Sequence, residues 1–186
     1  MRDFIKNSWQ ILLVEILVIS AFALFFGKFG DIMIDSFREV YIPQQILKGK
    51  CIYKDIFVIY PPLAYLINAF LMKIFGAGIN ILYLAGLFST MGIFFFTYKI
   101  AKIFLNEFES FTICIFLITG LALSPNVFNS FFPYSYGIVY GILFVIASLY
   151  FALNKKFPLT YLFYSLAILC KYELCFCVKC VKNRLI

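Results

Sequence analysis

Long apolar runs separated by short polar stretches dominate this chain. The runs at 8–26 and 140–153 approach or exceed the length that an apolar helix needs to cross a hydrocarbon core of ~30 Å. Strands of a β-barrel would instead give weaker, alternating segments. The pattern predicts transmembrane helices at 8–27, 79–98, 110–125, 137–154 and 158–174. We therefore expect an all-α, polytopic membrane protein of about five transmembrane helices.

The segment 61–76 decides the topology. It opens with two prolines, contains Asn68 and Lys73, and is short for a span, which suits a helix lying at the membrane interface. If it lies flat, six basic residues near the N-terminus and in two later loops share one side of the membrane: Arg2, Lys6, Lys99, Lys102, Lys155 and Lys156. The positive-inside rule then places the N-terminus in the cytoplasm and 28–78 outside, as the first extracytoplasmic loop.

Composition agrees with a membrane environment. Of the 186 residues, 64% are hydrophobic and 13% are charged, too few charges to cover an ordinary polar surface. The net charge of +7 fits Lys and Arg flanking the spans, and no basic face is gathered for nucleic acid, so we expect no nucleic-acid partner. The first apolar run lacks a small-x-small cleavage site behind it, which favours a retained span. The expected location is the inner (plasma) membrane, with several passes.

The six cysteines do not form the framework of a disulfide-rich protein. Cys51 lies in a polar segment, Cys114 lies in an apolar run, and four more crowd 170–180. The motif "CFCVKC" lacks the paired C-x-x-C spacing of zinc ribbons, and the chain has no histidine. The sequence does not favour a metal site.

A polar cluster precedes the flat segment and has two interpretations. Asp35, Arg38 and Glu39 have the i, i+3, i+4 spacing that places them on one face of a helix, which we expect to run to Ile42, just before a proline. In one interpretation Ser36 and Glu39 form a capping box at a helix start. In the other, a carboxylate at the membrane boundary acts as a general base on an acceptor hydroxyl or amine, with Arg38 available to a phosphate.

Other charged residues have open roles. Lys48, Lys50 and Lys54 suit either a phosphate or anionic lipid headgroups. Glu15 lies one or two turns inside the first expected span, where a carboxylate is a functional candidate. Because it is near the cytoplasmic side and can reach headgroups, Lys6 or another helix, we interpret it as structural.

A longer pattern, "G…Y.D…PPL.Y…A…FG", runs through the first outer loop. It is carried by Asp35, Glu39, Gly49, Tyr53, Asp55, Pro61, Pro62, Leu63, Tyr65, Ala69, Phe75 and Gly76. This pattern resembles the polyprenyl-phosphate-sugar-dependent glycosyltransferases of the GT-C fold, and in particular the superfamily of protein O-mannosyltransferases and lipid A aminoarabinose transferases. The later "FNSFFPYSYGIVYG" and "KYE" (171–173) are similar to bacterial members of the same group.

The resemblance implies a fold and a mechanism. Two helices of the first outer loop would lie along the membrane, and the donor would be a sugar on a polyprenyl-phosphate carrier. The acceptor would be an extracytoplasmic glycan, lipid or protein, and the reaction would invert the anomeric centre. The base would be an acid of the first outer loop, which carries over to Asp35 first and to Glu39 second. The dependence on a divalent metal stays open.

Two departures from the family bear on the substrate site. Where relatives have a Lys before the Pro pair this chain has Tyr60, so phosphate contact falls to Arg38 or Lys54. The second outer loop lacks the acid that some relatives place there, and its polar groups available to sugar hydroxyls are Asn126, Asn129, Tyr134 and Tyr136. Its aromatics are better suited to facing lipid or to anchoring at the interface. The expected substrate-binding residues are Arg38, Lys54, Tyr60, Asn129 and Tyr134.

The chain is short for a member of this family, and a second function class is therefore considered. Family enzymes are much longer, so 1–174 resembles the N-terminal part of a transmembrane module, and the polar ending 175–186 is expected to reflect a fragment or a frameshift. The alternative is a non-enzymatic polytopic protein, such as a transporter or an assembly subunit, whose acidic segment is only a capped interfacial helix. A transporter would be expected to show inverted repeats, and none is evident.

Overall fold

The computed structural model describes residues 9–27, 36–121 and 129–174, and within these ranges the chain is all-helical. The helices are α2 (Trp9–Phe25), α3 (Ser36–Leu47), α4 (Leu63–Phe75), α5 (Ile79–Phe104), α6 (Glu107–Leu121), α7 (Tyr136–Leu153), α8 (Phe157–Cys170) and the short 3₁₀ helix η1 (Tyr172–Leu174). The only β-type pairing in the described ranges is an isolated bridge between Ile52 and Ile56. The all-α fold class is confirmed.

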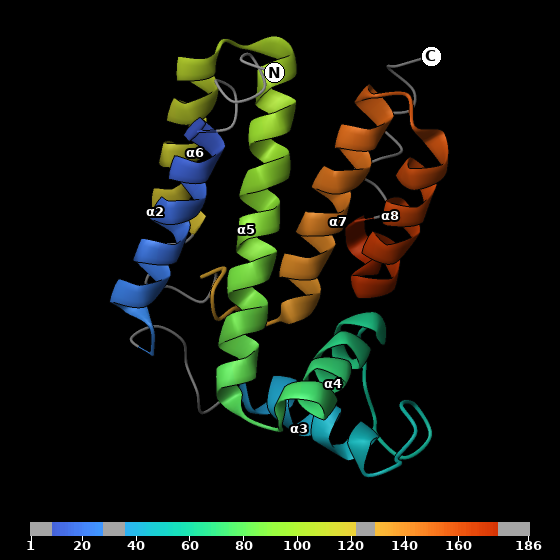
Figure 1. Cartoon of the computed structure of the whole chain (residues 1–186). Helices are drawn as coiled ribbons and strands as arrows, with labels where there is room; N and C mark the ends of the chain where they lie inside the picture. The colour runs from blue at the N-terminus through green and yellow to red at the C-terminus, as the bar shows by residue number, and fades with distance from the viewer. Residues whose placement is uncertain (1–8, 28–35, 122–128, 175–186) are drawn as a thin grey trace.

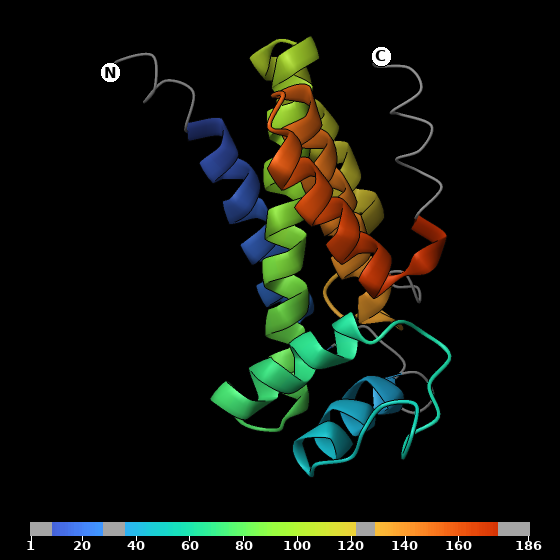
Figure 2. The same cartoon turned by 90° about the vertical axis from the view of Figure 1, so that its right-hand side faces the viewer.

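Five helices run roughly along one axis, and two lie across one end of the group. Figure 1 shows α2, α5, α6, α7 and α8 side by side, with α3 and α4 beneath them. The view turned by 90° in Figure 2 shows the same separation. The segment 61–76 was predicted to lie across the direction of the spans, and its helix α4 has that orientation relative to α5, α7 and α8.

The path of the chain places basic residues at the end remote from α3 and α4. Helix α5 rises from α4 toward the end where α2 begins, so Lys99 and Lys102 in its last turns lie there. The turn between α7 and α8, which contains Lys155 and Lys156, lies at that same end. Arg2 and Lys6, which were predicted to share this side, lie outside the described residues.

The helices pack through two connected apolar clusters. The first joins α2, α5 and α6 around Val14, Val18, Phe94 and Cys114. The second joins α4, α5, α7 and α8, and its buried members are Ala64, Met72, Leu82, Tyr83, Ala85, Phe132, Tyr136, Tyr140 and Cys170. Because the second cluster includes α4, the crossing pair α3–α4 is fixed to the bundle mainly through that helix.

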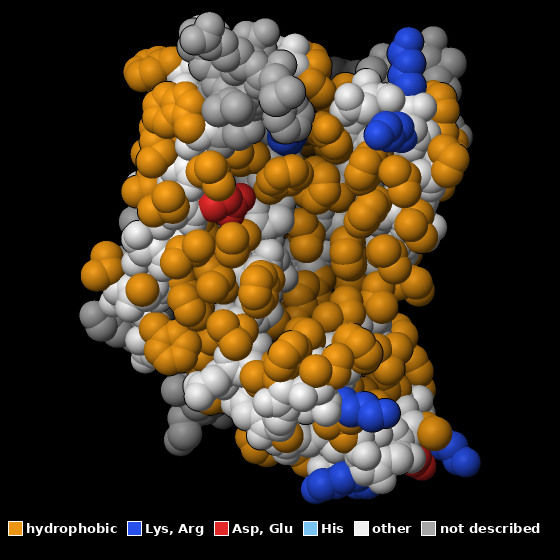
Figure 3. Space-filling view, in the orientation of Figure 1, with side chains coloured by type: hydrophobic (Ala, Val, Ile, Leu, Met, Phe, Trp, Pro, Cys, Tyr) orange, Lys and Arg blue, Asp and Glu red, His pale blue; other side chains and the backbone are white. Residues whose placement is uncertain are grey.

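Apolar side chains also cover the outside of the bundle. Figure 3 shows them along the whole face, while Lys and Arg gather near its two ends. Within the described ranges, α5 and α7 are long and apolar enough to cross a membrane, and α2, α4 and α8 are shorter apolar helices. Phe88 on α5, Phe116 on α6 and Leu162 on α8 are among the large hydrophobic residues that are more than half exposed. A protein surrounded by water rarely exposes so continuous an apolar surface.

Helix α3 extends further than predicted. It was expected to run to Ile42, but it continues past Pro43 to Leu47. A proline removes one hydrogen bond within a helix and crowds the preceding turn, but packing can outweigh that cost, and Ile42 and Pro43 are both buried. The helix stops before Gly49, which has a φ of +86°, a conformation that favours glycine.

Candidate functional site

A narrow crevice lies where the crossing helices meet the ends of the bundle. Its walls come from α3, the segment before α4, α4 itself, the start of α7 and the end of α8. The lining residues are Glu39, Tyr60, Pro61, Ala64, Tyr65, Ser135, Gly137, Cys170 and Lys171. The crevice contains about 210 Å³ of space, including the part open to solvent, and is too narrow to enclose a water molecule.

A buried carboxylate forms one wall of the crevice. Glu39 on α3 is 1% exposed, and its Oε1 lies 3.4 Å from Nη2 of Arg38. The same Nη2 donates a hydrogen bond of 3.4 Å to the backbone carbonyl of Tyr134, in the segment before α7. Burying a carboxylate is unfavourable unless a cation or hydrogen-bond donors compensate for lost hydration. Arg38 supplies this compensation and also links α3 to α7.

The ring of Tyr60 lies near two cations from different parts of the chain. The guanidinium carbon of Arg38 and the Nζ of Lys171, just after α8, are each 5.1 Å from the ring centroid. Both distances are within the range of cation–π attraction. Lys171 also forms an ion pair of 3.3 Å with Glu173. Through Tyr60, the two cations are brought to the same crevice as Glu39.

The segment 51–60 positions Tyr60. The Tyr53 hydroxyl donates a hydrogen bond of 2.9 Å to the backbone carbonyl of Tyr60. The turn itself is closed by Asp55, whose Oδ2 accepts the backbone N–H of Cys51 at 2.8 Å. Pro61 follows Tyr60 and restricts its backbone to extended conformations. These local features explain the orientation of Tyr60 without any bound ligand.

The absence of a side chain at Gly137 brings α7 and α8 together at the crevice. A Cβ atom built there would lie 2.9 Å from the backbone carbonyl oxygen of Cys170 and 3.8 Å from the Cβ of Ala64. Nearby, the Tyr136 hydroxyl donates a hydrogen bond of 2.6 Å to the carbonyl of Leu82 on α5. The start of α7 is therefore held close to α4, α5 and α8 at once.

Arg38 and Tyr65, on the two crossing helices, have shifted pKa values. Burial raises the pKa of the Tyr65 hydroxyl above its ordinary value, and the charge of Glu39 adds to the shift. For Arg38, burial acts to lower the pKa, but interactions with Tyr65, Glu39 and Tyr60 act in the opposite direction and leave it raised. Tyr65 therefore stays neutral and Arg38 stays cationic over the physiological pH range.

The structure brings together four of the residues predicted for the site. Glu39 and Tyr60 line the crevice, and Arg38 contacts both of them. Tyr134 takes part through its backbone carbonyl, which accepts the hydrogen bond from Arg38. Lys54 is exposed on the turn that closes at Asp55 and does not line the crevice.

The second outer loop contributes less to the crevice than its polar residues suggested. Asn129 is buried, and its Oδ1 accepts the backbone N–H groups of Phe131 and Phe132 at 2.8 and 3.3 Å, which organises the turn before α7. Sugar binding by Asn129 stays a prediction, as does the proposed role of Lys54. Asp35 and Asn126 lie outside the described residues, as does the side chain of Ser36, so the base assigned first and the capping box stay predictions as well.

Lys171, Ser135 and Cys170 line the crevice but were not selected as site residues from the sequence. Lys171 lies in the "KYE" that carried part of the resemblance, but no spacing relates it to Arg38, because they are distant in sequence and meet only in the folded chain. Ser135 lies in the "FNSFFPYSYGIVYG" that also carried part of the resemblance, and Cys170 was noted only as one of the clustered cysteines. In the described part of the chain, no group of three or more His, Cys, Asp or Glu side chains is placed to hold a metal ion.

Comparison with known proteins found no relative of this chain. No protein-family model, curated protein or solved structure matches the chain. The chemistry must therefore be inferred from the crevice itself, which combines a buried carboxylate with two cations at one end of an apolar bundle. Such a combination can accept a proton from a bound hydroxyl and can hold an oxyanion.

Proposed function

We propose that the chain is a polytopic membrane protein with α3 and α4 along the outer membrane surface. The proposal is supported by the apolar exterior of the bundle and by the two helices α5 and α7. It is also supported by Lys99, Lys102, Lys155 and Lys156 at the end remote from α3, where the positive-inside rule would place the cytoplasm.

We further propose that this protein is a membrane glycosyltransferase of GT-C type or the N-terminal part of one. The observation that carries this proposal is the buried carboxylate of Glu39 beside Arg38, in a crevice that also contains Lys171. The donor would be a sugar linked to a polyprenyl phosphate, and the acceptor an extracytoplasmic glycan, lipid or protein. The position at the end of an apolar bundle suits a donor whose tail stays in the bilayer.

The roles of the residues follow from charge and burial. The general base is a carboxylate, either Asp35 from the sequence-based assignment or Glu39 in the crevice. This carboxylate takes the proton of the acceptor hydroxyl while the hydroxyl oxygen forms the new bond to the anomeric carbon. The bond from that carbon to the phosphate oxygen breaks, and the phosphate leaves with the electron pair. Arg38 and Lys171 would stabilise the charge that develops on the phosphate.

A non-enzymatic membrane subunit is the second candidate. The observation in its favour is the narrowness of the crevice, which admits no water molecule in this conformation. In that case Arg38 and Glu39 would only join α3 to α7.

Transfer from labelled lipid-linked sugars distinguishes the two candidates. Membranes containing the full chain would be incubated with a panel of tritiated polyprenyl-phosphate sugars, and transfer of the label from the polyprenyl phosphate to any other molecule would be measured. Asp35→Asn or Glu39→Gln should abolish transfer while the protein stays in the membrane fraction. The control is Glu107→Gln, which changes an acid at the opposite end of the bundle, paired with Lys102. Unchanged transfer in both the Asp35→Asn and the Glu39→Gln variants would refute the proposed chemistry.

A further inference from the structure

The ring of Tyr60 connects two sides of the crevice that are otherwise weakly joined. Arg38 belongs to α3, and Lys171 follows α8. Their contacts with Tyr60, together with the bond of 3.4 Å from Arg38 to the Tyr134 carbonyl, connect the crossing helices to the ends of α7 and α8 on this side. A hydrogen bond of this length is weak, and a partly exposed cation–π contact is modest.

The packing of α3 allows this connection to open. Among the described elements, α3 packs extensively against α4 alone, and a small apolar cluster of Ile42, Val58 and Tyr65 joins it to the 51–60 segment. Helix α3 contributes one partly buried residue, Val40, to the edge of the second large cluster and none to the first. Helix α3 and the segment 51–60 can therefore move away from α7 and α8 while the buried members of both clusters stay packed. Regions held by few contacts open locally at a small fraction of the cost of global unfolding.

We propose that Tyr60 is a gate over the crevice, held closed by Arg38 and Lys171 and released when an oxyanion binds those two cations. An anion forms stronger, charge-assisted bonds with guanidinium and ammonium groups than an aromatic ring does. Binding would therefore exchange the two ring contacts for ion pairs and uncover Glu39 and Cys170. The inference rests on the proposed function only for the class of ligand, an oxyanion such as a phosphate.

Two buried cysteines allow the gate to be observed directly. Cys170 lines the crevice and is 1% exposed, whereas Cys114 is 0% exposed inside the α2–α5–α6 cluster, away from the crevice. One variant would retain only Cys170 and a second only Cys114, with every other cysteine replaced by serine. The rate at which each thiol reacts with a small maleimide, in detergent-solubilised full-length chain, then reports opening of the crevice and of the bundle separately.

Substitution of Tyr60 should change the labelling rate of Cys170 and not that of Cys114. Tyr60→Ala is expected to accelerate labelling of Cys170 about tenfold, because two cation–π contacts are lost. Tyr60→Phe, which retains an aromatic ring, should leave the rate near its original value. Cys114 should stay unreactive in every background. An unchanged Cys170 rate in Tyr60→Ala would overturn the gate, and equal acceleration of Cys114 would overturn it too, because the bundle itself would then be opening.

The trigger is tested with inorganic phosphate as the probe. At constant ionic strength, replacing chloride with phosphate should accelerate Cys170 labelling when Tyr60, Arg38 and Lys171 are present, and should have no effect in Lys171→Met. No response to phosphate in the unaltered chain would overturn the oxyanion trigger. Because no sugar transfer is measured, a gate found in a chain that fails the transfer assay would refute the proposed function alone.

Discussion

The hydroxyl of Tyr140 donates a hydrogen bond of 2.6 Å to Oδ1 of Asn68, and both side chains are buried. The bond joins α7 to α4, so it ties a helix of the bundle to a helix that crosses its end. Polar pairs of this kind specify how apolar helices fit together, because an unpaired polar group in an apolar interior is costly.

Removing one partner of this pair should destabilise the protein. Tyr140→Phe leaves Oδ1 of Asn68 buried without that donor, at an expected cost of about 1–3 kcal/mol in the free energy of unfolding. The double variant Tyr140→Phe with Asn68→Leu should lose less than the sum of the single variants, since no polar group is then left unpaired. Thermal unfolding in detergent measures both effects. The control is Tyr161→Phe on an exposed tyrosine of α8, and additive losses in the double variant would contradict the coupling.

Much of the helical pattern, though not its limits, could be predicted from the apolar runs. The run expected to end at 98 continues to Phe104 as α5, because Lys99 and Lys102 are accommodated in the last turns, where long basic side chains can extend toward water. The run expected at 110–125 begins at Glu107, where Asn106 and Glu109 cap each other: the Glu109 backbone N–H donates to Asn106 Oδ1 at 2.9 Å. Charged residues that end a hydropathy window can still belong to the helix.

Spacing along the chain could select site residues only where they are close in sequence, whereas Tyr60 and Tyr134 were selected through the family resemblance. Arg38 and Glu39 could be selected because neighbouring positions on one helix stay together in any fold that contains the helix. The approach of Lys171 to Tyr60 depends on how α8 packs on α7 and α4, and Gly137 permits that packing without any local pattern that marks it. Such contacts depend on the tertiary arrangement, which hydropathy does not specify.

A methyl group at Gly137 should open the contact between α7 and α8. The added Cβ of Gly137→Ala would lie 2.9 Å from the backbone oxygen of Cys170, and backbone atoms cannot move aside as flexible side chains can. Overpacking of this kind typically costs about 1–3 kcal/mol, so the melting temperature in detergent should fall.

The matched control for Gly137 is another helical glycine. Gly120 in α6 has open space where a Cβ would be added, so Gly120→Ala should leave stability unchanged or raise it slightly. If both alanine variants melted at the same temperature as the unaltered protein, close packing at Gly137 would not be important for stability.

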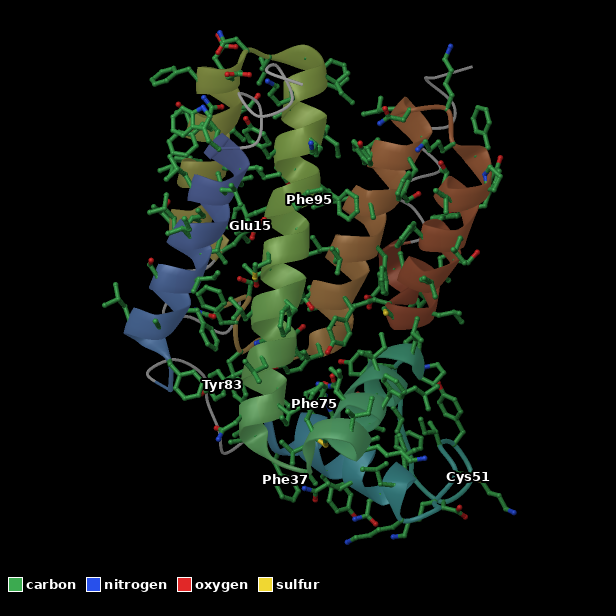
Figure 4. All side chains as sticks on the ribbon, viewed as in Figure 1. Glu15, Phe37, Cys51, Phe75, Tyr83 and Phe95 are labelled. Carbon is green, nitrogen blue, oxygen red and sulfur yellow. The ribbon has the colours of Figure 1, made fainter. Side chains whose placement is uncertain are left out.

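Glu15 should be replaceable by an apolar residue with a gain in stability. Figure 4 shows it on α2, on the side that faces α5, and its Oε2 is buried without a hydrogen-bond partner among the described residues. A buried polar atom without a partner typically costs about 1–3 kcal/mol, so replacing this partly buried carboxyl by an apolar side chain of similar size removes that cost. Glu15→Leu should therefore raise the melting temperature. Glu15→Gln, which keeps the shape and a polar end, should raise it less, and a lower melting temperature in Glu15→Leu would show that the carboxylate has a necessary partner.

Labelling from the two sides of the membrane should separate the two ends of the bundle. Cys51 is exposed at the α3–α4 end, as Figure 4 shows, and the turn with Lys155 lies at the opposite end. In intact cells a membrane-impermeant maleimide should react with a variant that retains only Cys51. It should not react with a cysteine-free background carrying Lys155→Cys until the membrane is permeabilised. Both sites were chosen because they are exposed, so a difference between them reports sidedness and not burial. Reaction of both in intact cells, or of neither, would refute the proposed topology in which α3 and α4 lie on the outer surface.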